Sequence, residues 1–317
     1  MVSLIALSLP GIAALGALLF TWMQVGQASK ELSISEHGQI TSRFNFAVDH
    51  LGSQSLDIRL GGIYALQRIM QDSPRDQPTV VSVLAAFAQR HAGSSADSLK
   101  KPIDPEVTPT PVADVRAAIA TLVHRRPNLD RGTIVDLSKT DLRGLRFNER
   151  APIKLPNVDL SEADLREASL AGADLHKAYL WDVNLEGADL GGANLWGAYL
   201  AGASLPNSSL AGANLRRADM TCIDLFINET GAVEERQNCV DMQLVDLTDA
   251  DLRNAIMSDV NLSYAILSGA DFRGADLARS NLSNADLTNA DFRGAKLTDI
   301  KLEGATTTGA LGLPLDD

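Results

Sequence analysis

The fold is decided by residues 163–200, which read ADLREASLAGADLHKAYLWDVNLEGADLGGANLWGAYL. Leucine stands at every fifth position of this stretch, usually with alanine two places before it and Asp or Asn one place before it. The same spacing runs from Leu155 to Leu225 over 15 units and from Met242 to Leu302 over 13 units. A period of five fits neither a helix, at 3.6, nor a strand, at 2. The pattern therefore predicts a repeat solenoid.

The repeated unit resembles that of the pentapeptide-repeat family, which is commonly written A(D/N)LXX. The resemblance rests on strings such as ADLRE (163–167), ADLHK (173–177), ANLWG (193–197) and ADLTN (285–289). It implies a right-handed quadrilateral β-solenoid in which four units form one square coil. Positions twenty apart would then stack at about 4.8 Å, the spacing of neighbouring parallel strands.

In such a coil the central residue and the residue two before it should point inward. Alanine fills 18 of the 28 positions two before the centre, as a narrow core requires. Phe272 should stack on Phe292 inside, while Tyr179 should stack on Tyr199 and His176 on Trp196 outside. The predicted core includes Leu165, Leu185, Leu190, Leu205, Phe272 and Phe292.

The N-terminal residues 2–23 contain no charged side chain and predict a transmembrane helix. Twenty-two helical residues measure about 33 Å, enough for a bilayer core of about 30 Å. Lys30 and Arg43 follow the span and no basic residue precedes it. The positive-inside rule then places the rest of the chain in the cytoplasm. The stretch 57–78 resembles a helical block of membrane-anchored bacterial pentapeptide-repeat proteins, which implies the bacterial inner membrane.

Four further segments are predicted along the chain. Apolar residues at helical spacing indicate a small α-helical domain over residues 27–91 and a capping helix over residues 113–126. The Pro- and Ser-rich stretch 92–111 between them is typical of a linker. The solenoid is expected over residues 133–310, and an insertion loop at 226–240 interrupts its register.

The sequence contains no catalytic constellation, so we expect no enzyme activity. The five histidines are scattered, and no cofactor or metal motif is present. Cys222 and Cys239 flank the insertion. We interpret them as two separate thiols in a reducing compartment; the alternative is a redox pair that closes the insertion.

The net charge of −12 argues against binding to nucleic acid. The sequence therefore favours a membrane-tethered interaction scaffold with an unknown protein partner. The tail after residue 305 is too short for a dimerising helix, so we expect a monomer. The alternative is an acidic DNA mimic that binds a type II topoisomerase, a function the family includes. Candidate partner contacts are the exposed aromatic residues and the insertion acids: Tyr179, Trp181, Trp196, Tyr199, Glu229, Glu234 and Glu235.

Overall fold

The computed structural model describes residues 2–98, 110–147, 152–227 and 233–314. Within these ranges, the side chains of residues 2–17, 28–29, 31–37, 97–98 and 224–237 are not described. The chain forms two compact units, the first ending at Ser73 and the second beginning at Pro74. Each unit is considered by itself.

The first unit consists of helices α1 (Val2–Leu51) and α2 (Leu56–Asp72), which pack against each other. Close approach occurs at Gly62, where a Cβ atom would lie 2.8 Å from the carbonyl oxygen of Ala47. Arg43 pairs with Asp72 across the helices at 3.0 Å. The buried side chains between them are Ala47, Leu51, Ile63, Leu66, Ile69 and Met70.

The predicted transmembrane helix at 2–23 is part of α1, a single helix that continues through Leu51. Within the described part of the chain, no helix is both long and apolar enough to cross a membrane. The described side chains of Leu18, Phe20, Trp22 and Met23 are 63–75% exposed. Most of the predicted span, residues 2–17, lies outside the described side chains.

The second unit begins with helices α3 (Gln77–His91), α4 (Ser95–Ser98) and α5 (Ala113–Val123) and the short 3-10 helix η1 (Pro127–Leu129). Helix α3 packs against α5, so the division differs from the predicted helical domain at 27–91. The reason is that Leu84 and Phe87 of α3 share one buried core with Ile119 of α5. Most of the predicted linker, residues 99–109, lies outside the described residues.

Helices α3 and α5 join the first coil of the solenoid. The side chain of Arg125 is only 1% exposed, and its Nε donates to Asp130 Oδ2 at 2.8 Å. Its Nη1 donates to the carbonyl oxygen of Lys154 at 2.8 Å. From α3, Gln89 Nε2 donates to Asp136 Oδ1 at 2.8 Å. The helices thus provide the terminal cap that an open stack of repeats requires.

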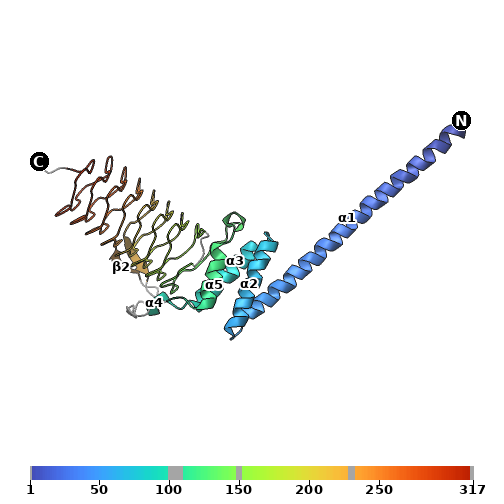
Figure 1. Cartoon of the computed structure of the whole chain (residues 1–317), viewed down its shortest axis with the longest axis horizontal. Helices are drawn as coiled ribbons and strands as arrows, with labels where there is room; N and C mark the ends of the chain where they lie inside the picture. Colours follow the sequence, from blue (N-terminus) through green and yellow to red (C-terminus); the bar gives the residue numbers. More distant parts are fainter. Residues whose placement is uncertain (1, 99–109, 148–151, 228–232, 315–317) are drawn as a thin grey trace. The chain divides into compact units, whose positions relative to one another are not determined.

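The solenoid consists of single-residue parallel bridges, mostly between residues twenty apart, from Asp136 to Leu311 (Figure 1). Four faces repeat around each coil. We number them by their central residues. Face 1 includes Leu180 and Leu200, face 2 includes Leu185 and Leu205, face 3 includes Leu190 and Leu210, and face 4 includes Leu175, Leu195, Phe272 and Phe292. This confirms the predicted repeat solenoid and its twenty-residue step.

The interior of the solenoid is filled as predicted. Every central residue from Leu155 to Met220 and from Met242 to Phe292 is buried, including all six predicted core residues. Phe272 and Phe292 stack inside with ring centroids 4.7 Å apart. Burial of each leucine stabilises the rod by about 2 kcal/mol.

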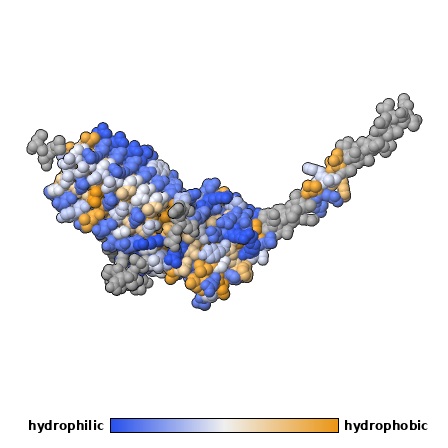
Figure 2. Space-filling view, viewed as in Figure 1, coloured by the Kyte–Doolittle hydropathy of each residue, from blue (hydrophilic) through white to orange (hydrophobic). Residues whose placement is uncertain are grey.

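Corners are formed by a left-handed residue two places after each centre from Leu155 to Leu215 and from Met242 to Leu302. The side chain of the Asp or Asn before the centre accepts a hydrogen bond from the backbone N–H of the residue after the centre. Asp189 Oδ1, for example, accepts from the N–H of Gly191 at 3.0 Å. These side chains hold the turns from outside. Figure 2 shows the result, a mainly hydrophilic solenoid surface with scattered apolar residues.

The register is interrupted by an antiparallel hairpin of strands β1 (Ile223–Ile227) and β2 (Val233–Asn238). The predicted loop at 226–240 therefore begins too late, because residue 225 belongs to β1 and not to a coil. Met220 is the last central residue before the hairpin, and Met242 is the next one after it.

Candidate functional site

The most distinctive outer feature of the solenoid is an aromatic pair on face 1. Tyr179 and Tyr199 are bridge partners in adjacent coils, and their rings stack with centroids 5.3 Å apart. Tyr179 remains 38% exposed and Tyr199 46% exposed. The predicted stack is confirmed. It places two parallel rings on a backbone that hydrogen bonds hold from both sides.

Two tryptophans lie at the corners beside this pair. Trp181 follows Leu180 at one corner and is 36% exposed. Trp196 follows Leu195 at the other, where Lys177 Nζ lies 5.3 Å from the centroid of its ring. We call Tyr179, Trp181, Trp196 and Tyr199 the aromatic patch. The predicted stack of His176 on Trp196 is replaced by two other contacts: His176 Nδ1 lies 2.7 Å from Asp174 Oδ1, and the Trp196 ring faces Lys177 Nζ.

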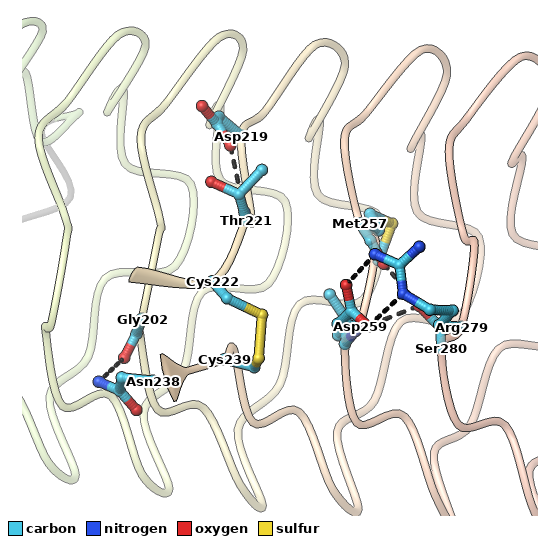
Figure 3. Close-up of a disulfide and its surroundings, with 11 residues drawn as sticks. Gly202, Asp219, Thr221, Cys222, Asn238, Cys239, Met257, Asp259, Arg279 and Ser280 are labelled. Carbon is cyan, nitrogen blue, oxygen red and sulfur yellow. Dashed lines mark hydrogen bonds and ion pairs between the residues drawn. A yellow bond between two sulfur atoms is a disulfide. The ribbon is translucent and has the colours of Figure 1, made fainter. Parts of the chain in front are cut away.

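The hairpin is closed at its base by a disulfide between Cys222 and Cys239 (Figure 3). The interpretation as two separate thiols is therefore wrong. The register explains why they meet. Ser204 pairs with Asp241, thirty-seven residues on, which is seventeen more than the usual twenty. The cysteines are also seventeen apart. Removing the insertion would place them at the same repeat position, a signal present in the sequence.

The base of the hairpin leans onto the preceding coils at the corner that follows face 1. Asn238 Nδ2 donates to the carbonyl oxygen of Gly202 at 3.1 Å (Figure 3). It also donates to Asp182 Oδ1 at 2.5 Å. A Cβ atom on Gly202 would lie 2.8 Å from Cδ1 of Ile223. Glycine at this position thus leaves the space that the hairpin base occupies.

The aromatic patch and the hairpin are consequently neighbours. Asp182 directly follows Trp181, and Gly202 lies three residues after Tyr199, so both contact points of Asn238 adjoin face 1. The structure brings together two features that the sequence predicted separately. Glu229 lies outside the described residues, and the side chains of Glu234 and Glu235 are likewise not described. Their role stays a prediction.

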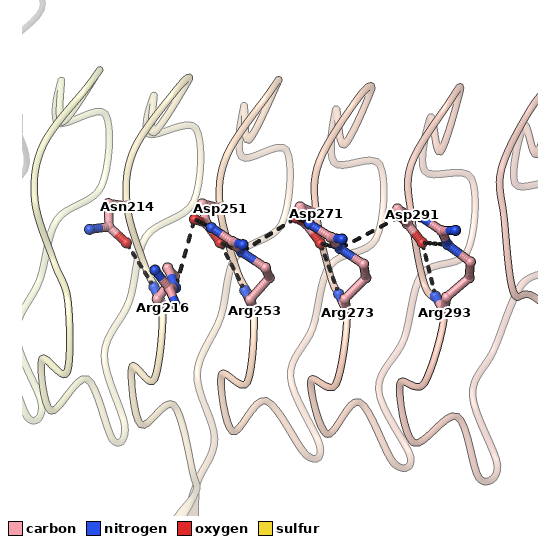
Figure 4. Close-up of polar contacts among 8 residues, drawn as sticks. All are labelled: Asn214, Arg216, Asp251, Arg253, Asp271, Arg273, Asp291 and Arg293. Atoms are coloured by element: carbon pink, nitrogen blue, oxygen red, sulfur yellow. Dashed lines mark hydrogen bonds and ion pairs between the residues drawn. The ribbon is translucent and has the colours of Figure 1, made fainter.

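Along the corner after face 4, the coils beyond the hairpin carry a ladder of aspartates and arginines (Figure 4). Arg253, Arg273 and Arg293 each hold the Asp two residues earlier through Nε and Nη2, at 2.6–2.9 Å. Arg253 and Arg273 also reach the Asp of the next coil, at 3.4 and 3.7 Å. The ladder therefore links successive coils as well as closing each turn.

The ladder shifts the ionisation of its members. Arg293 donates to the carboxylate of Asp291 and lowers its pKa to about 2, although desolvation opposes the shift. The hydrogen bond from Arg273 lowers the pKa of Asp271 in the same way. Burial would raise the pKa of Asp251, but the hydrogen bonds from Arg253 outweigh it and the pKa is lowered. All three carboxyls are charged at neutral pH, so the ladder is internally neutralised.

The described side chains do not suggest a catalytic or metal centre. Within the described ranges, no group of three or more His, Cys, Asp and Glu is placed to hold a metal ion. The lowered aspartate pKa values point away from general acid work at neutral pH, since an acid needs a pKa near the working pH. The site is a surface of aromatic rings and a hairpin.

Comparison with known families supports the repeat assignment. The family model described as "Pentapeptide repeats" matches in 8 copies, over residues 153–182, 184–221, 241–277 and 265–304. Among curated proteins, none matches the chain.

Several solved structures are similar to the solenoid. HetL, a pentapeptide repeat protein involved in heterocyst differentiation regulation in the cyanobacterium Nostoc, is 33% identical; the match covers 56% of this chain and 84% of that one, with a TM-score of 0.32. A pentapeptide repeat protein of the Arabidopsis thaliana thylakoid lumen is 28% identical; the match covers 37% of this chain and 70% of that protein, with a TM-score of 0.30. QnrB1, a plasmid-mediated fluoroquinolone resistance protein, is 18% identical; the match covers 56% of this chain and 90% of that protein, with a TM-score of 0.36.

Proposed function

Because the chain belongs to the pentapeptide-repeat family, we propose that it is a non-enzymatic interaction scaffold whose solenoid binds a protein partner through the aromatic patch and the adjoining hairpin. The observation that carries the proposal is the stacked, half-exposed pair of Tyr179 and Tyr199 beside the hairpin base. Aromatic side chains dominate binding energy at protein interfaces. Rings held rigidly by a solenoid lose little conformational entropy on binding.

The test is affinity capture of the full-length chain after cross-linking in native membranes. The variants Tyr199→Asn and Trp196→Gln should reduce recovery of a discrete partner by about tenfold or more, as expected for interface anchors. A variant with Tyr64→Asn, an exposed tyrosine on α2 outside the solenoid, serves as the matched control. Undiminished capture by the Tyr199 and Trp196 variants together would contradict the proposal.

The hairpin can be tested separately through Gly202. In the Gly202→Asn variant the residue keeps a left-handed conformation that Asn tolerates, while its side chain occupies the space of the Asp182 carboxylate, Ile223 and Asn238. The hairpin base should move away from the coil, while the Cys222–Cys239 disulfide still closes it. If capture depends on the hairpin, it falls in this variant with an unchanged melting temperature.

We also propose that α1 tethers the scaffold to a bacterial inner membrane, with the solenoid on the cytoplasmic side. Support comes from the uncharged residues 2–23 and from the two basic residues that follow them. Membrane fractionation of the full chain and of a chain lacking residues 2–23 tests the tether. The side is tested by alkylation in intact cells. The Cys222–Cys239 disulfide weighs against the cytoplasmic side, because cysteines there are largely reduced. Reduced, alkylated cysteines in intact cells would support the cytoplasmic placement, and fully blocked cysteines would contradict it.

A second candidate function, a DNA mimic that binds a type II topoisomerase, is favoured by the net charge of −12. The nearly balanced charge on faces 4 and 1 weighs against a DNA mimic. Over residues 173–182, 193–202, 213–222, 250–259, 270–279 and 290–299 these faces carry nine acids and eight bases. A duplex presents negative charge on all sides. Inhibition of gyrase supercoiling by the purified chain would revive this function.

A further inference from the structure

A second surface of the solenoid, on faces 2 and 3 beyond the hairpin, has an apolar centre. Leu244 and Tyr264 occupy the same corner in adjacent coils and are 51% and 52% exposed. The backbone N–H of Leu244 donates to Ser263, directly before Tyr264, at 3.1 Å. Ile266 follows around the corner on face 3 and is 46% exposed. We call these three residues the apolar corner.

Two of these residues hold a backbone conformation that suits them poorly. The corner residue two places after a centre is left-handed, and φ is +60° at Leu244 and +61° at Tyr264. Glycine, Asn and Asp adopt this conformation most readily. Among the described corner residues with positive φ, all except Leu244 and Tyr264 are glycine, polar or charged. Neither fold stability nor burial explains them, because half of each side chain lies in solvent.

On faces 2 and 3, the charges in the coils around the apolar corner are all of one sign. Over residues 183–192, 203–212, 240–249, 260–269 and 280–289, faces 2 and 3 carry six acids and no base. Faces 4 and 1 of the same rod are nearly balanced, so the repeat itself does not impose this difference. The acids nearest the apolar corner are Asp241, Asp246, Asp249 and Asp286.

The described partners of these carboxylates are neutral. Asp246 accepts from Thr248 at 2.7 Å and Asp241 from Asn261 at 2.9 Å. Asp286 accepts from Thr288 at 2.5 Å and from Ser268 at 2.8 Å. Hydrogen bonds from Thr288 and Ser268 lower the pKa of Asp286. These hydrogen bonds hold the carboxylates on the surface without the arginines that neutralise the ladder on face 4.

From this arrangement we infer that the apolar corner and its acidic surroundings are a docking surface for a basic, amphipathic segment of a partner protein. Apolar side chains of the segment would cover Leu244, Tyr264 and Ile266. Its lysines or arginines would face Asp246 and Asp286, which lie one coil before and one coil after Ile266 in the same column. The inference goes beyond the proposed function, since this surface lies on other faces than the aromatic patch.

The test uses an 18-residue helical peptide of Lys, Leu and Ala as the probe. Fluorescence anisotropy would measure its binding to the full chain in nanodiscs of zwitterionic lipid, with empty nanodiscs as the blank. Two control peptides carry Glu in place of Lys, or Ala in place of Leu. The Lys–Leu peptide should bind, while both controls should bind about tenfold more weakly or worse.

The deciding variant is Leu244→Asn with Tyr264→Asn. Asn favours the left-handed corner, so this variant should fold at least as well as the wild type, as a melting curve would verify. Binding of the Lys–Leu peptide should fall by about tenfold or more. The matched control, Tyr179→Asn with Tyr199→Asn, should leave that binding unchanged.

Three outcomes would overturn the inference. The first is equal binding of the Lys–Leu peptide by the wild type and by the Leu244/Tyr264 variant. The second is binding of the Glu–Leu peptide as tight as that of the Lys–Leu peptide. The third is self-association in sedimentation that the variant abolishes, which would identify a second copy of this chain as the occupant.

Discussion

The corner after face 4 carries different side chains before and after the hairpin, on the same backbone. Before it, the corner residues are His176, Trp196 and Arg216, and the column beside them is Asp174, Asn194 and Asn214. After it, every coil repeats the same pair of Asp and Arg, from Asp251 to Arg293. Two of the earlier coils carry the rings of His176 and Trp196 there, the third carries Arg216, which lies 3.9 Å from Asp251, and the later coils carry a neutralised ionic ladder. Position in the repeat therefore sets the geometry, and the side chain sets what a partner meets.

The largest effect should come from the interior, where the two regions are alike. Leu190 and Leu267 are both face 3 centres, with exposures of 1% and 0%. Replacing either by Ala should lower the free energy of unfolding by about 2–5 kcal/mol. Denaturant unfolding of the full chain in a non-ionic detergent would measure both. Similar losses would show one rod on both sides of the hairpin, whereas an unchanged midpoint for either variant would refute its inward placement.

The disulfide at the boundary should have the next largest effect. The coils hold both ends of the insertion together, so the native state keeps Cys222 and Cys239 close together even when they are reduced. The Cys222–Cys239 bond spans a separation of 17 residues, and a crosslink closing a loop of similar length stabilises by about 3 kcal/mol. Melting should therefore occur at a lower temperature after reduction with dithiothreitol. The Cys222→Ser/Cys239→Ser variant controls for the reductant: it should melt like the reduced wild type and not respond to the reagent.

A smaller effect should separate the two corners at acid pH. The pKa values of Asp251, Asp271 and Asp291 are lowered in the folded chain. A carboxyl of this kind stabilises the fold above its unfolded pKa, about 3.9, and the contribution is lost as the pH falls through the folded value. For Asp291 the folded value is about 2. The ladder should therefore weaken between about pH 4 and pH 2.

Thermal melts at pH 5, pH 3 and pH 2 would measure this loss in the wild type and in Asp271→Asn/Asp291→Asn. The variant should depend less on pH over that range. The matched change Asn194→Asp, in the column before the hairpin, would add a carboxylate whose corner residue is Trp196 and not an arginine, and it should not reproduce the wild-type profile. An identical pH profile for the wild type and the Asp271/Asp291 variant would show that the ladder does not contribute to stability.

Sequence patterns predicted the solenoid well because its contacts follow from a fixed period. Given the period of five and four units per coil, the inward leucines, the Phe272–Phe292 stack and the Tyr179–Tyr199 stack all follow. The pairing of α3 with α5 does not, since either amphipathic helix could cover several apolar faces and the choice depends on non-local packing. The disulfide was missed for a different reason. Its signal, the equal repeat position of Cys222 and Cys239, becomes visible only when the whole insertion is removed from the count.

The apolar corner shows the limit of reading one position at a time. Leu244 and Tyr264 look like ordinary variable positions of the repeat in the linear sequence. Only the left-handed backbone and the exposed surface show that they are unusual. Only the sorting of charges by face shows that faces 2 and 3 carry no base between residues 183 and 289. Such features depend on which residues the coil stacks together.

The central claim, that the aromatic patch binds a partner, is tested most directly by hydroxyl-radical footprinting of the full chain with and without its captured partner. The method reports the exposure of individual Tyr and Trp side chains. Tyr64, on α2 and 57% exposed, provides an internal reference. We predict that oxidation of Tyr179 and Tyr199 falls when the partner is bound, while that of Tyr64 stays constant. Unchanged oxidation of Tyr179 and Tyr199 in the bound state would contradict the proposed interaction surface.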